Sequence, residues 1–383
     1  MLLLVAFGCN RQPTAKFSPA EELNDLPQQH QEQIQTMLTN MFGTPANPTL
    51  RLPQDPEQAE ADSDEASADE SANSTKAKSN FEDLLSVDEL ARLRHGAQVY
   101  SKRCSGCHGA AGDGNGEVAE YLVPKPRDYR QGIFKFTSTP YGIKPARHDL
   151  VRIIRRGAKG TSMPAFRWMS DQDIEAVIDF VIYVSVRGQT ESTMTLIAED
   201  FDADEPIEVF EFIDAVTNAR SDWTDAESQV ILPVSAEPAN DLDSVLAGAE
   251  TFRSKGCVQC HGLDAKGQTE WLSKEFLAKL NALAADQKIE INYDAWNNPA
   301  PAADITARLL HGGRRPIDIY RRIYTGINGT PMPAFGEAFA ENPETIWNLV
   351  HYVLHIIEGG DPKVGLGEEG SESESATELN EAA

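Results

Sequence analysis

The sequence lacks any run of about 18 or more apolar residues, so no internal transmembrane helix is expected. Basic residues are outnumbered, with 34 Lys and Arg against 60 Asp and Glu, and a formal net charge of −26 argues against nucleic acid as the main partner. Cysteine is rare, at five in 383 residues, and a chain of this length is not a small scaffold held together by disulfides. It has room for two or three domains with ordinary apolar cores.

Four of the five cysteines form two identical C-x-x-C-H patterns, which read CSGCH at 104–108 and CVQCH at 257–261. On a helical turn, residues at i, i+3 and i+4 project to one face, so two thiols and an imidazole meet there. This spacing is typical of covalent c-type haem attachment. A zinc site needs four nitrogen or sulfur ligands, and further ligands are missing at both patterns. Because thioether formation needs reduced thiols and exported haem, the patterns indicate a compartment outside the cytoplasm.

The chain also contains an internal repeat with an offset of 169 residues. The segment 149–166 (DLVRIIRRGAKGTSMPAF) matches 318–335 (DIYRRIYTGINGTPMPAF) at ten of eighteen positions, including the whole Met-Pro-Ala-Phe string. A repeat of this length indicates domain duplication. The two C-x-x-C-H patterns are offset by only 153, so the second copy carries about 16 extra residues, which we expect at Trp271–Asp286.

The iron of a c-type haem takes a second ligand opposite its histidine, and the candidates are Met163 and Met332. Each lies in a loop set off by glycine and followed by proline, where a thioether can approach a haem. Methionine more often fills apolar cores, but both repeats keep Met-Pro at matching places. Met169 is the alternative ligand in the first repeat. The candidate carbonyls for fixing each histidine's tautomer belong to Pro124 or Pro126 and to Pro299 or Pro301.

Composition divides the chain into two compact units with acidic segments around them. We expect the compact units at 84–189 and 242–358, each beginning and ending with an amphipathic helix. The first of these is net basic, whereas the segments around them are rich in Asp and Glu. Such segments bury too little apolar surface to fold, so disorder is expected in most of them. They are a polar arm and acidic tether (10–83), a connector (190–241) in which apolar pairs favour some helix, and a tail (359–383).

Local signals place several helices more closely. Ser86 and Glu89 form a capping-box pattern at the start of the first compact unit. Ser170 is a candidate N-cap for an amphipathic helix over Asp171–Val186. In the arm, Gln33–Phe42 has the apolar spacing of a short helix, but we interpret the arm as solvated rather than as a docking element.

The segment 1–9 is apolar and ends in Gly8 before Cys9, which resembles the end of a bacterial lipoprotein signal. The alternative is a truncated ordinary signal peptide with an incidental cysteine, since Phe7 is bulky and no basic residue precedes the run. We favour a lipidated Cys9, because every other cysteine belongs to a C-x-x-C-H pattern and an unpaired exported thiol would be unusual. The expected location is therefore the periplasm or cell envelope, with a lipid anchor to the membrane.

The order of helix, C-x-x-C-H, methionine loop and helix resembles class I c-type cytochromes, here as two tandem domains covering a little over half of the chain. The resemblance implies an all-α fold in which the first and last helices of each domain cross at a glycine–aromatic contact. The candidates for that contact are Gly96 and Tyr100 with Phe180 or Tyr183, and Gly248 and Phe252 with Tyr352. It also implies two covalently attached haem c groups. Their thioethers would form at Cys104, Cys107, Cys257 and Cys260, and their axial ligands would be His108, Met163, His261 and Met332.

The leading functional hypothesis is the relay of single electrons between a membrane quinol-oxidising complex and a terminal oxidase or reductase. The first unit resembles, more narrowly, lipoprotein cytochrome subunits of membrane respiratory complexes. One alternative is an enzyme similar to dihaem cytochrome c peroxidases, which need one haem with a releasable distal ligand. Another is a cytochrome subunit held permanently in a larger complex, for which the segment 10–50 would be the docking element.

Overall fold

The computed structural model describes residues 15–54, 81–267 and 293–366. These residues are mostly helical with little strand, so the predicted all-α fold class is confirmed. None of the described helices combines the length and the apolar character needed to cross a bilayer. Cys9, the expected insertion at Trp271–Asp286 and most of the acidic tail lie outside the described residues.

The chain separates into two compact units. Unit 1 consists of residues 1–132 and 168–224, and unit 2 consists of residues 133–167 and 225–383. The second unit therefore holds both copies of the repeated Met-Pro-Ala-Phe string, whereas the two C-x-x-C-H patterns are divided between the units.

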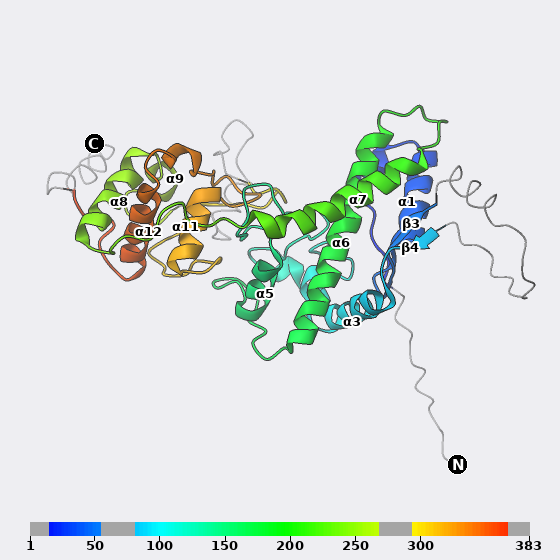
Figure 1. Ribbon diagram of the computed structural model, residues 1–383, viewed down its shortest axis with the longest axis horizontal. Helices are drawn as coiled ribbons and strands as arrows, with labels where there is room; N and C mark the ends of the chain where they lie inside the picture. The colour runs from blue at the N-terminus through cyan, green and yellow to red at the C-terminus, as the bar shows by residue number, and fades with distance from the viewer. Residues whose placement is uncertain (1–14, 55–80, 268–292, 367–383) are drawn as a thin grey trace, which may run out of the picture. The chain divides into compact units, whose positions relative to one another are not determined.

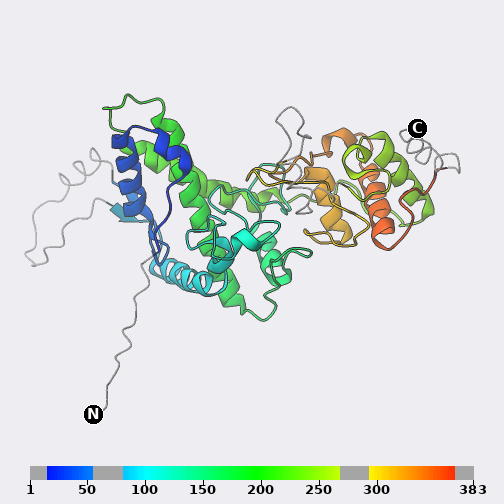
Figure 2. The ribbon, with the colours of Figure 1, turned by 180° about the vertical axis from the view of Figure 1, so that it is seen from behind.

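Helices α3 (Val87–Arg103) and α6 (Asp171–Ala198) pack against each other in unit 1, as Figures 1 and 2 show from opposite sides. The predicted capping box begins α3, because the Glu89 backbone N–H donates to Ser86 Oγ and the Ser86 backbone N–H donates to the Glu89 carboxylate. Ser170 likewise caps α6, because its hydroxyl accepts a hydrogen bond from the Asp173 backbone N–H.

The two helices of unit 1 cross at Gly96, where an added Cβ would lie 1.9 Å from the Ala176 carbonyl oxygen. Only glycine permits so close an approach of two backbones. One turn along, the rings of Tyr100 and Phe180 lie with their centroids 4.9 Å apart. The predicted glycine–aromatic crossing is therefore confirmed, with Phe180 as the partner.

The described part of the arm ahead of α3, residues 15–54 and 81–83, is folded. It contains η1 (Glu21–Asp25), α1 (Gln28–Phe42) and two small antiparallel pairs, which are β1 (Gly43–Thr44) with β2 (Asn47–Pro48) and β3 (Arg51–Pro53) with β4 (Phe81–Asp83). Ile34, Leu38 and Phe42 on α1 are fully buried, and Tyr183 of α6 donates a hydrogen bond to the Phe42 carbonyl. The prediction of a solvated arm is thus wrong for residues 15–54, because a few apolar side chains at helical spacing pack against α6.

The connector is also largely helical. Helix α6 continues to Ala198, and α7 (Val209–Ala226) and η3 (Glu227–Gln229) follow it. Phe212, Val216 and Trp223 of α7 are buried. The helix that the apolar pairs favoured in the connector is confirmed. The expectation of disorder is wrong for these elements, because one apolar face of helical period lies within an acidic average composition.

In unit 2, α8 (Leu242–Ser254) and α12 (Glu344–Ile357) lie side by side. An added Cβ at Gly248 would lie 2.0 Å from the Asn348 carbonyl oxygen, and the rings of Phe252 and Tyr352 are 5.2 Å apart, so this crossing is also confirmed. The remaining helices are α4 (Ser105–His108) and η2 (Ala119–Tyr121) in unit 1, and α5 (Arg147–Arg156), α9 (Val258–His261), α11 (Pro316–Thr325) and η6 (Glu337–Phe339) in unit 2.

Candidate haem-binding sites

The first C-x-x-C-H pattern forms one turn of helix at the end of α3. The backbone N–H of His108 donates to the Cys104 carbonyl at 2.9 Å, which closes the turn. Cys104 and Cys107 are both free thiols, and burial raises the pKa of Cys104 to about 12. The two thiols are therefore not paired with each other, and that of Cys104 is uncharged.

Two groups fix the imidazole of His108. Its Nδ1 donates to the Arg127 carbonyl at 3.1 Å, so Nε2 is the ring nitrogen that carries the lone pair. Burial lowers the pKa of His108, so the neutral form needed for iron ligation is favoured. The prediction of a proline carbonyl is wrong here, since the acceptor is the residue after Pro126.

Tyr129 lies against the same imidazole. Its ring is stacked on that of His108 at a centroid distance of 4.7 Å, and its hydroxyl donates to Nε2 at 3.1 Å. Burial raises the pKa of Tyr129 far above its usual range, so the hydroxyl is neutral. No pattern in the sequence marks this tyrosine, and the sequence analysis missed it.

The second C-x-x-C-H pattern repeats the arrangement in unit 2. Nδ1 of His261 donates to the Ala303 carbonyl at 3.1 Å, and burial lowers the pKa of the imidazole. Cys257 and Cys260 are free thiols, and burial raises the pKa of Cys257 to about 11. The predicted acceptors Pro299 and Pro301 are again wrong, because the carbonyl belongs to a neighbouring alanine.

A glycine six residues after each histidine allows the carbonyl segment to pack against the turn. Gly114 donates its N–H to the His108 carbonyl at 2.9 Å, and Gly267 does the same to the His261 carbonyl at 2.9 Å. Both glycines have positive φ, and an added Cβ would come within 2.8 Å and 2.3 Å of backbone oxygens in the carbonyl segments. The two acceptor carbonyls are 176 residues apart while the histidines are 153 apart, so the second copy gains 23 residues before its acceptor.

The position of Tyr129 has an apolar counterpart in the second repeat. The Tyr129 N–H donates to the Gly112 carbonyl at 2.7 Å, and the Ile305 N–H donates to the Ala265 carbonyl at 2.9 Å. These pairs keep the offsets of 176 and 153, so Ile305 corresponds to Tyr129 in the backbone. The second histidine therefore has no equivalent hydroxyl at this position.

The two methionine loops begin where a helix ends at glycine. Gly157 ends α5 and Gly326 ends α11, both with positive φ. An added Cβ would lie 2.6 Å from the Met163 carbonyl oxygen in the first loop and 2.7 Å from the Met332 carbonyl oxygen in the second. Each loop thus folds back over its own glycine, as the predicted glycine-bounded loop requires.

The hydrogen bonds within these loops are the same in both copies. The Met163 carbonyl accepts from the Ala158 N–H at 3.2 Å, and the Met332 carbonyl accepts from the Ile327 N–H at 3.2 Å. A threonine two residues before each methionine accepts from its backbone N–H, at 3.1 Å in the first loop and 3.3 Å in the second. Both methionines are partly exposed and lie outside the helix cores.

The predicted site residues are distributed unequally between the two units. Cys257, Cys260, His261 and Met332 all belong to unit 2. Cys104, Cys107 and His108 belong to unit 1, and Met163 belongs to unit 2. The two pairs of axial ligands and the lipidation of Cys9 stay predictions.

The donor set fits a covalently attached haem. Each turn offers two free thiols and an imidazole whose Nδ1 is held by a carbonyl, so that Nε2 carries the lone pair that an iron would take. At His108 this lone pair accepts a hydrogen bond from the Tyr129 hydroxyl, which a bound iron would replace. Among the described residues, no group of three or more His, Cys, Asp or Glu side chains is arranged to hold a bare metal ion. A bound haem would supply one-electron redox chemistry at its iron.

Comparisons with known proteins assign the two regions separately. Residues 91–181 match the family described as cytochrome C oxidase, cbb3-type, subunit III, and residues 245–356 match the family described as cytochrome c. A comparison with curated proteins gives no match. Among solved structures, a chain of the Kuenenia stuttgartiensis reducing HAO-like protein complex is 25% identical with a TM-score of 0.49, covering 68% of this chain and 95% of that chain. A TM-score of this size does not establish a shared fold.

Proposed function

Because this chain consists of two cytochrome c domains in tandem with flanking segments, we propose that it relays single electrons between the redox proteins of a respiratory chain. Haem-based electron transfer follows from the domains themselves. The observation that supports this relay is that both repeats hold the candidate ligands in the same way. Both histidines are tied at Nδ1 to a backbone carbonyl, and both methionine loops have the same hydrogen bonds.

We assign the axial ligands as His108 with Met163 and His261 with Met332. An iron with six protein and porphyrin ligands passes electrons without binding a substrate, and methionine ligation raises its reduction potential relative to two histidines. Within the chain, the carbonyls of Arg127 and Ala303 orient the imidazoles, and Met163 and Met332 would supply the ligands on the opposite side. The protein is on this proposal an electron carrier and not an enzyme.

We further propose that the protein acts in the periplasm or cell envelope, anchored by lipid at Cys9. Covalent haem attachment at two C-x-x-C-H turns supports an exported protein, since it needs reduced thiols and exported haem. The proposed partners are a quinol-oxidising complex as electron donor and an oxidase or reductase as acceptor. The net basic charge of residues 84–189 favours an acidic surface on one partner, so association should slow as salt rises.

The proposal is tested by the visible spectrum of the reduced protein with and without carbon monoxide. We expect two haems per chain, each covalently bound, and no spectral change on adding carbon monoxide, because both irons keep their methionine. Substituting alanine for Met163 or for Met332 should each open one haem of the two to carbon monoxide. Met169→Ala is the matched control and should leave the spectrum unchanged.

Carbon monoxide binding to one haem of the unsubstituted protein would contradict the pure carrier. It would indicate a labile distal ligand and favour an enzyme of the dihaem peroxidase kind. A haem content of one per chain would contradict the duplicated site itself.

A further inference from the structure

The second methionine loop is covered more closely than the first. We define the first loop as 157–163 and the second loop as 326–332, which correspond at the repeat offset of 169 and both belong to unit 2. Lys159 and Gly160 of the first loop are exposed, whereas their equivalents Asn328 and Gly329 are buried and half-buried. Because the hydrogen bonds within the two loops are the same, the difference comes from the residues that lie over them.

A short turn lies over the second loop. This turn, residues 293–299, is called the clamp, and it belongs to the longer segment between the second C-x-x-C-H turn and its carbonyl acceptor. Its Ala295 N–H donates to the Gly329 carbonyl at 2.8 Å. An added Cβ at Gly329 would lie 2.9 Å from the Trp296 ring, so the ring lies directly on this glycine. Among the described residues, no backbone N–H donates to the carbonyl of Gly160, the equivalent glycine in the first loop.

A carboxylate inside the clamp fixes the shape of its turn. Asp294 Oδ1 accepts from the backbone N–H groups of Trp296 at 3.0 Å and Asn298 at 2.9 Å. Asn297 between them has a φ of 57°, a left-handed conformation that asparagine adopts more readily than most residues. The Asp294 side chain is only 6% exposed, so its other oxygen needs a partner within the protein.

That partner is a lysine of the first methionine segment, which we define as residues 133–167. Lys135 Nζ donates to Asp294 Oδ2 at 2.8 Å and lies 5.6 Å from the centroid of the Trp296 ring. The ammonium therefore contacts both the carboxylate that shapes the clamp and the ring that covers the loop. Both side chains of the ion pair are largely buried, so removing the lysine would leave a carboxylate without its charge partner.

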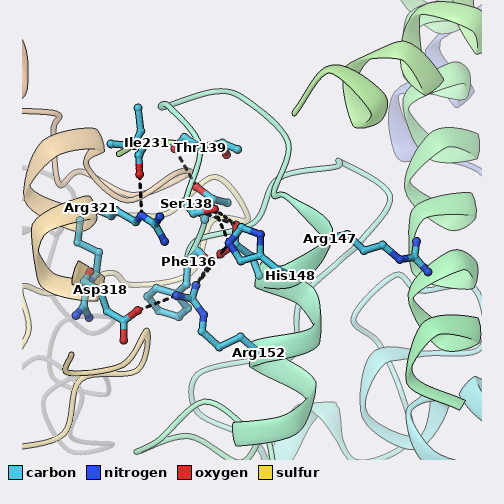
Figure 3. Close-up of polar contacts among 12 residues, drawn as sticks. Phe136, Ser138, Thr139, Arg147, His148, Arg152, Ile231, Asp318 and Arg321 are labelled. Carbon is cyan, nitrogen blue, oxygen red and sulfur yellow. Dashed lines mark hydrogen bonds and ion pairs between the residues drawn. The ribbon is translucent and has the colours of Figure 1, made fainter. Parts of the chain in front are cut away.

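The first methionine segment is itself fixed to the helix that leads into the second loop. Figure 3 shows Arg152 of α5 reaching Asp318 of α11, and the same guanidinium donates to the Phe136 carbonyl at 3.1 Å. Phe136 directly follows the lysine that contacts the clamp. The Gly142 N–H of this segment also donates to Asn328 Oδ1 of the second loop at 2.8 Å. The clamp, the first methionine segment and the second loop therefore pack together inside unit 2.

We propose that the clamp holds the second methionine loop closed and so keeps Met332 in place as an iron ligand, with Trp296 and Lys135 as the positioning residues. The inference rests on the proposed function, in which Met332 is an axial ligand. A thioether is a soft, uncharged ligand, so its retention at a ferric iron depends on the loop that presents it.

The clamp acts on the methionine through the backbone of the loop. Thr330 follows the covered Gly329, and its hydroxyl accepts from the Met332 backbone N–H at 3.3 Å. Opening the loop would break the hydrogen bond from Ala295 and would move the glycine away from the Trp296 ring. The second loop should therefore open less often than the first, and its methionine should be replaced more slowly by other ligands.

Hydrogen exchange of the reduced holoprotein, followed by NMR, measures the opening of both loops in one sample. The amides of Ile327 and Thr330 make the same hydrogen bonds as those of Ala158 and Thr161 in the first loop. In the unsubstituted protein the second pair should exchange at least about tenfold more slowly, because opening also breaks a hydrogen bond and a ring contact. Trp296→Ala should remove most of this difference.

Three further variants separate the clamp from a general loss of structure. Tyr293→Ala is the matched control, because it removes an aromatic side chain that is 49% exposed from the same turn. It should leave exchange in the second loop unchanged. Trp296→Phe should restore most of the protection, since a smaller ring still covers the glycine. Lys135→Met keeps an apolar stem without the charge, so it should speed exchange in the second loop less than Trp296→Ala.

Ligand replacement at the iron gives a reading that a merely structural role would not change. Imidazole added to the ferric holoprotein replaces a methionine whose loop opens, and the visible spectrum follows this replacement. Trp296→Ala should speed it at the haem of His261 by at least about tenfold, in step with loop opening. The haem of His108 should keep its rate, since the first loop has no contact with the clamp among the printed hydrogen bonds of the described residues.

Equal hydrogen exchange in the two loops of the unsubstituted protein would overturn the inference. So would a Trp296→Ala variant that speeds exchange in the first loop as much as in the second, or unchanged imidazole replacement in both Trp296→Ala and Lys135→Met. Amide exchange does not depend on which atom binds the iron. Carbon monoxide binding by the unsubstituted protein would therefore count against the proposed function, while the hydrogen exchange of the loops would still decide whether the clamp holds the second loop closed.

Discussion

Tyr129 places its hydroxyl 3.1 Å from Nε2 of His108, whereas Ile305 occupies the corresponding backbone position beside His261. The two histidines are otherwise held alike, each donating from Nδ1 to a carbonyl at 3.1 Å. The first imidazole thus has a polar neighbour, and in the second repeat that position is apolar.

The methionine loops themselves show no such divergence. The loops around Met163 and Met332 share their glycines, their threonine hydrogen bonds and the approach of the backbone to the leading glycine. Duplication has therefore preserved the backbone frame around the histidines and the methionines, while the group beside the histidine differs. Two haems with the same ligands and different surroundings are expected to have different reduction potentials.

The largest effect on stability is expected at the two helix crossings, which are alike in both repeats. Gly96→Ala and Gly248→Ala should each cost about 3 kcal/mol of unfolding free energy, because the new methyl meets a backbone carbonyl and the helices must separate. Gly106→Ala is the control, since nothing lies within 4 Å of its added Cβ. Denaturant unfolding measures the loss.

Hydrogen exchange can show whether each loss stays in its own unit. Gly96→Ala should loosen α3 and α6, and Gly248→Ala should loosen α8 and α12. If either variant lost no more unfolding free energy than Gly106→Ala, the helices at that crossing could separate at no cost. The close contact at that glycine would then not stabilise its unit.

The helices that form these crossings were predictable because their signals are local in sequence. A serine three residues before a glutamate predicts a capping box, and Ser86 with Glu89 forms one. Apolar spacing on Asp171–Val186 predicted a helix, and the structure extends it to Ala198. The glycine–aromatic contact was expected from the family resemblance, and in the structure the ring that packs against Tyr100 is that of Phe180.

The features that sequence reasoning missed depend on distant partners. Helix α1 is polar on average, and its burial depends on α6, where Tyr183 bonds to a carbonyl 141 residues away. The histidine acceptors were missed because every residue carries a carbonyl, so only the path of the backbone selects Arg127 and Ala303. The ligand roles of Met163 and Met332 stay predictions, since spacing fixes the loops and not what binds there.

A smaller effect on stability is expected at Asp318, which is buried in α11 of unit 2. Burial alone would raise the pKa of Asp318, but the hydrogen bond from Arg315 and the charges of Arg152 and Arg322 outweigh it and lower the pKa. A lowered folded-state pKa contributes stability that is present above the unfolded value of about 3.9 and is lost as pH falls through the folded value. The contribution is therefore complete at neutral pH, where the carboxylate is ionised in both the folded and the unfolded chain.

Urea unfolding of Asp318→Asn at pH 7 and at pH 3 measures this contribution. At pH 7 the variant should be less stable than the unsubstituted protein. At pH 3 the difference should shrink, because the aspartate of the unfolded chain, with a pKa of about 3.9, is then mostly protonated. An equal penalty at both pH values would mean that the hydrogen bonds of Asp318 matter and its charge does not.

The smallest expected effect is a shift in reduction potential, and it tests whether the hydroxyl beside His108 makes the two haem sites different. A hydroxyl beside the imidazole favours the more highly charged ferric centre, so Tyr129→Phe should raise the potential of the haem at His108 by a few tens of millivolts. The haem at His261 should keep its potential, since Ile305 already supplies an apolar neighbour there. A redox titration that resolves both haems measures the two values in one sample. If both potentials move together, the effect acts on the fold as a whole; if neither moves, the hydroxyl does not set the difference between the haems.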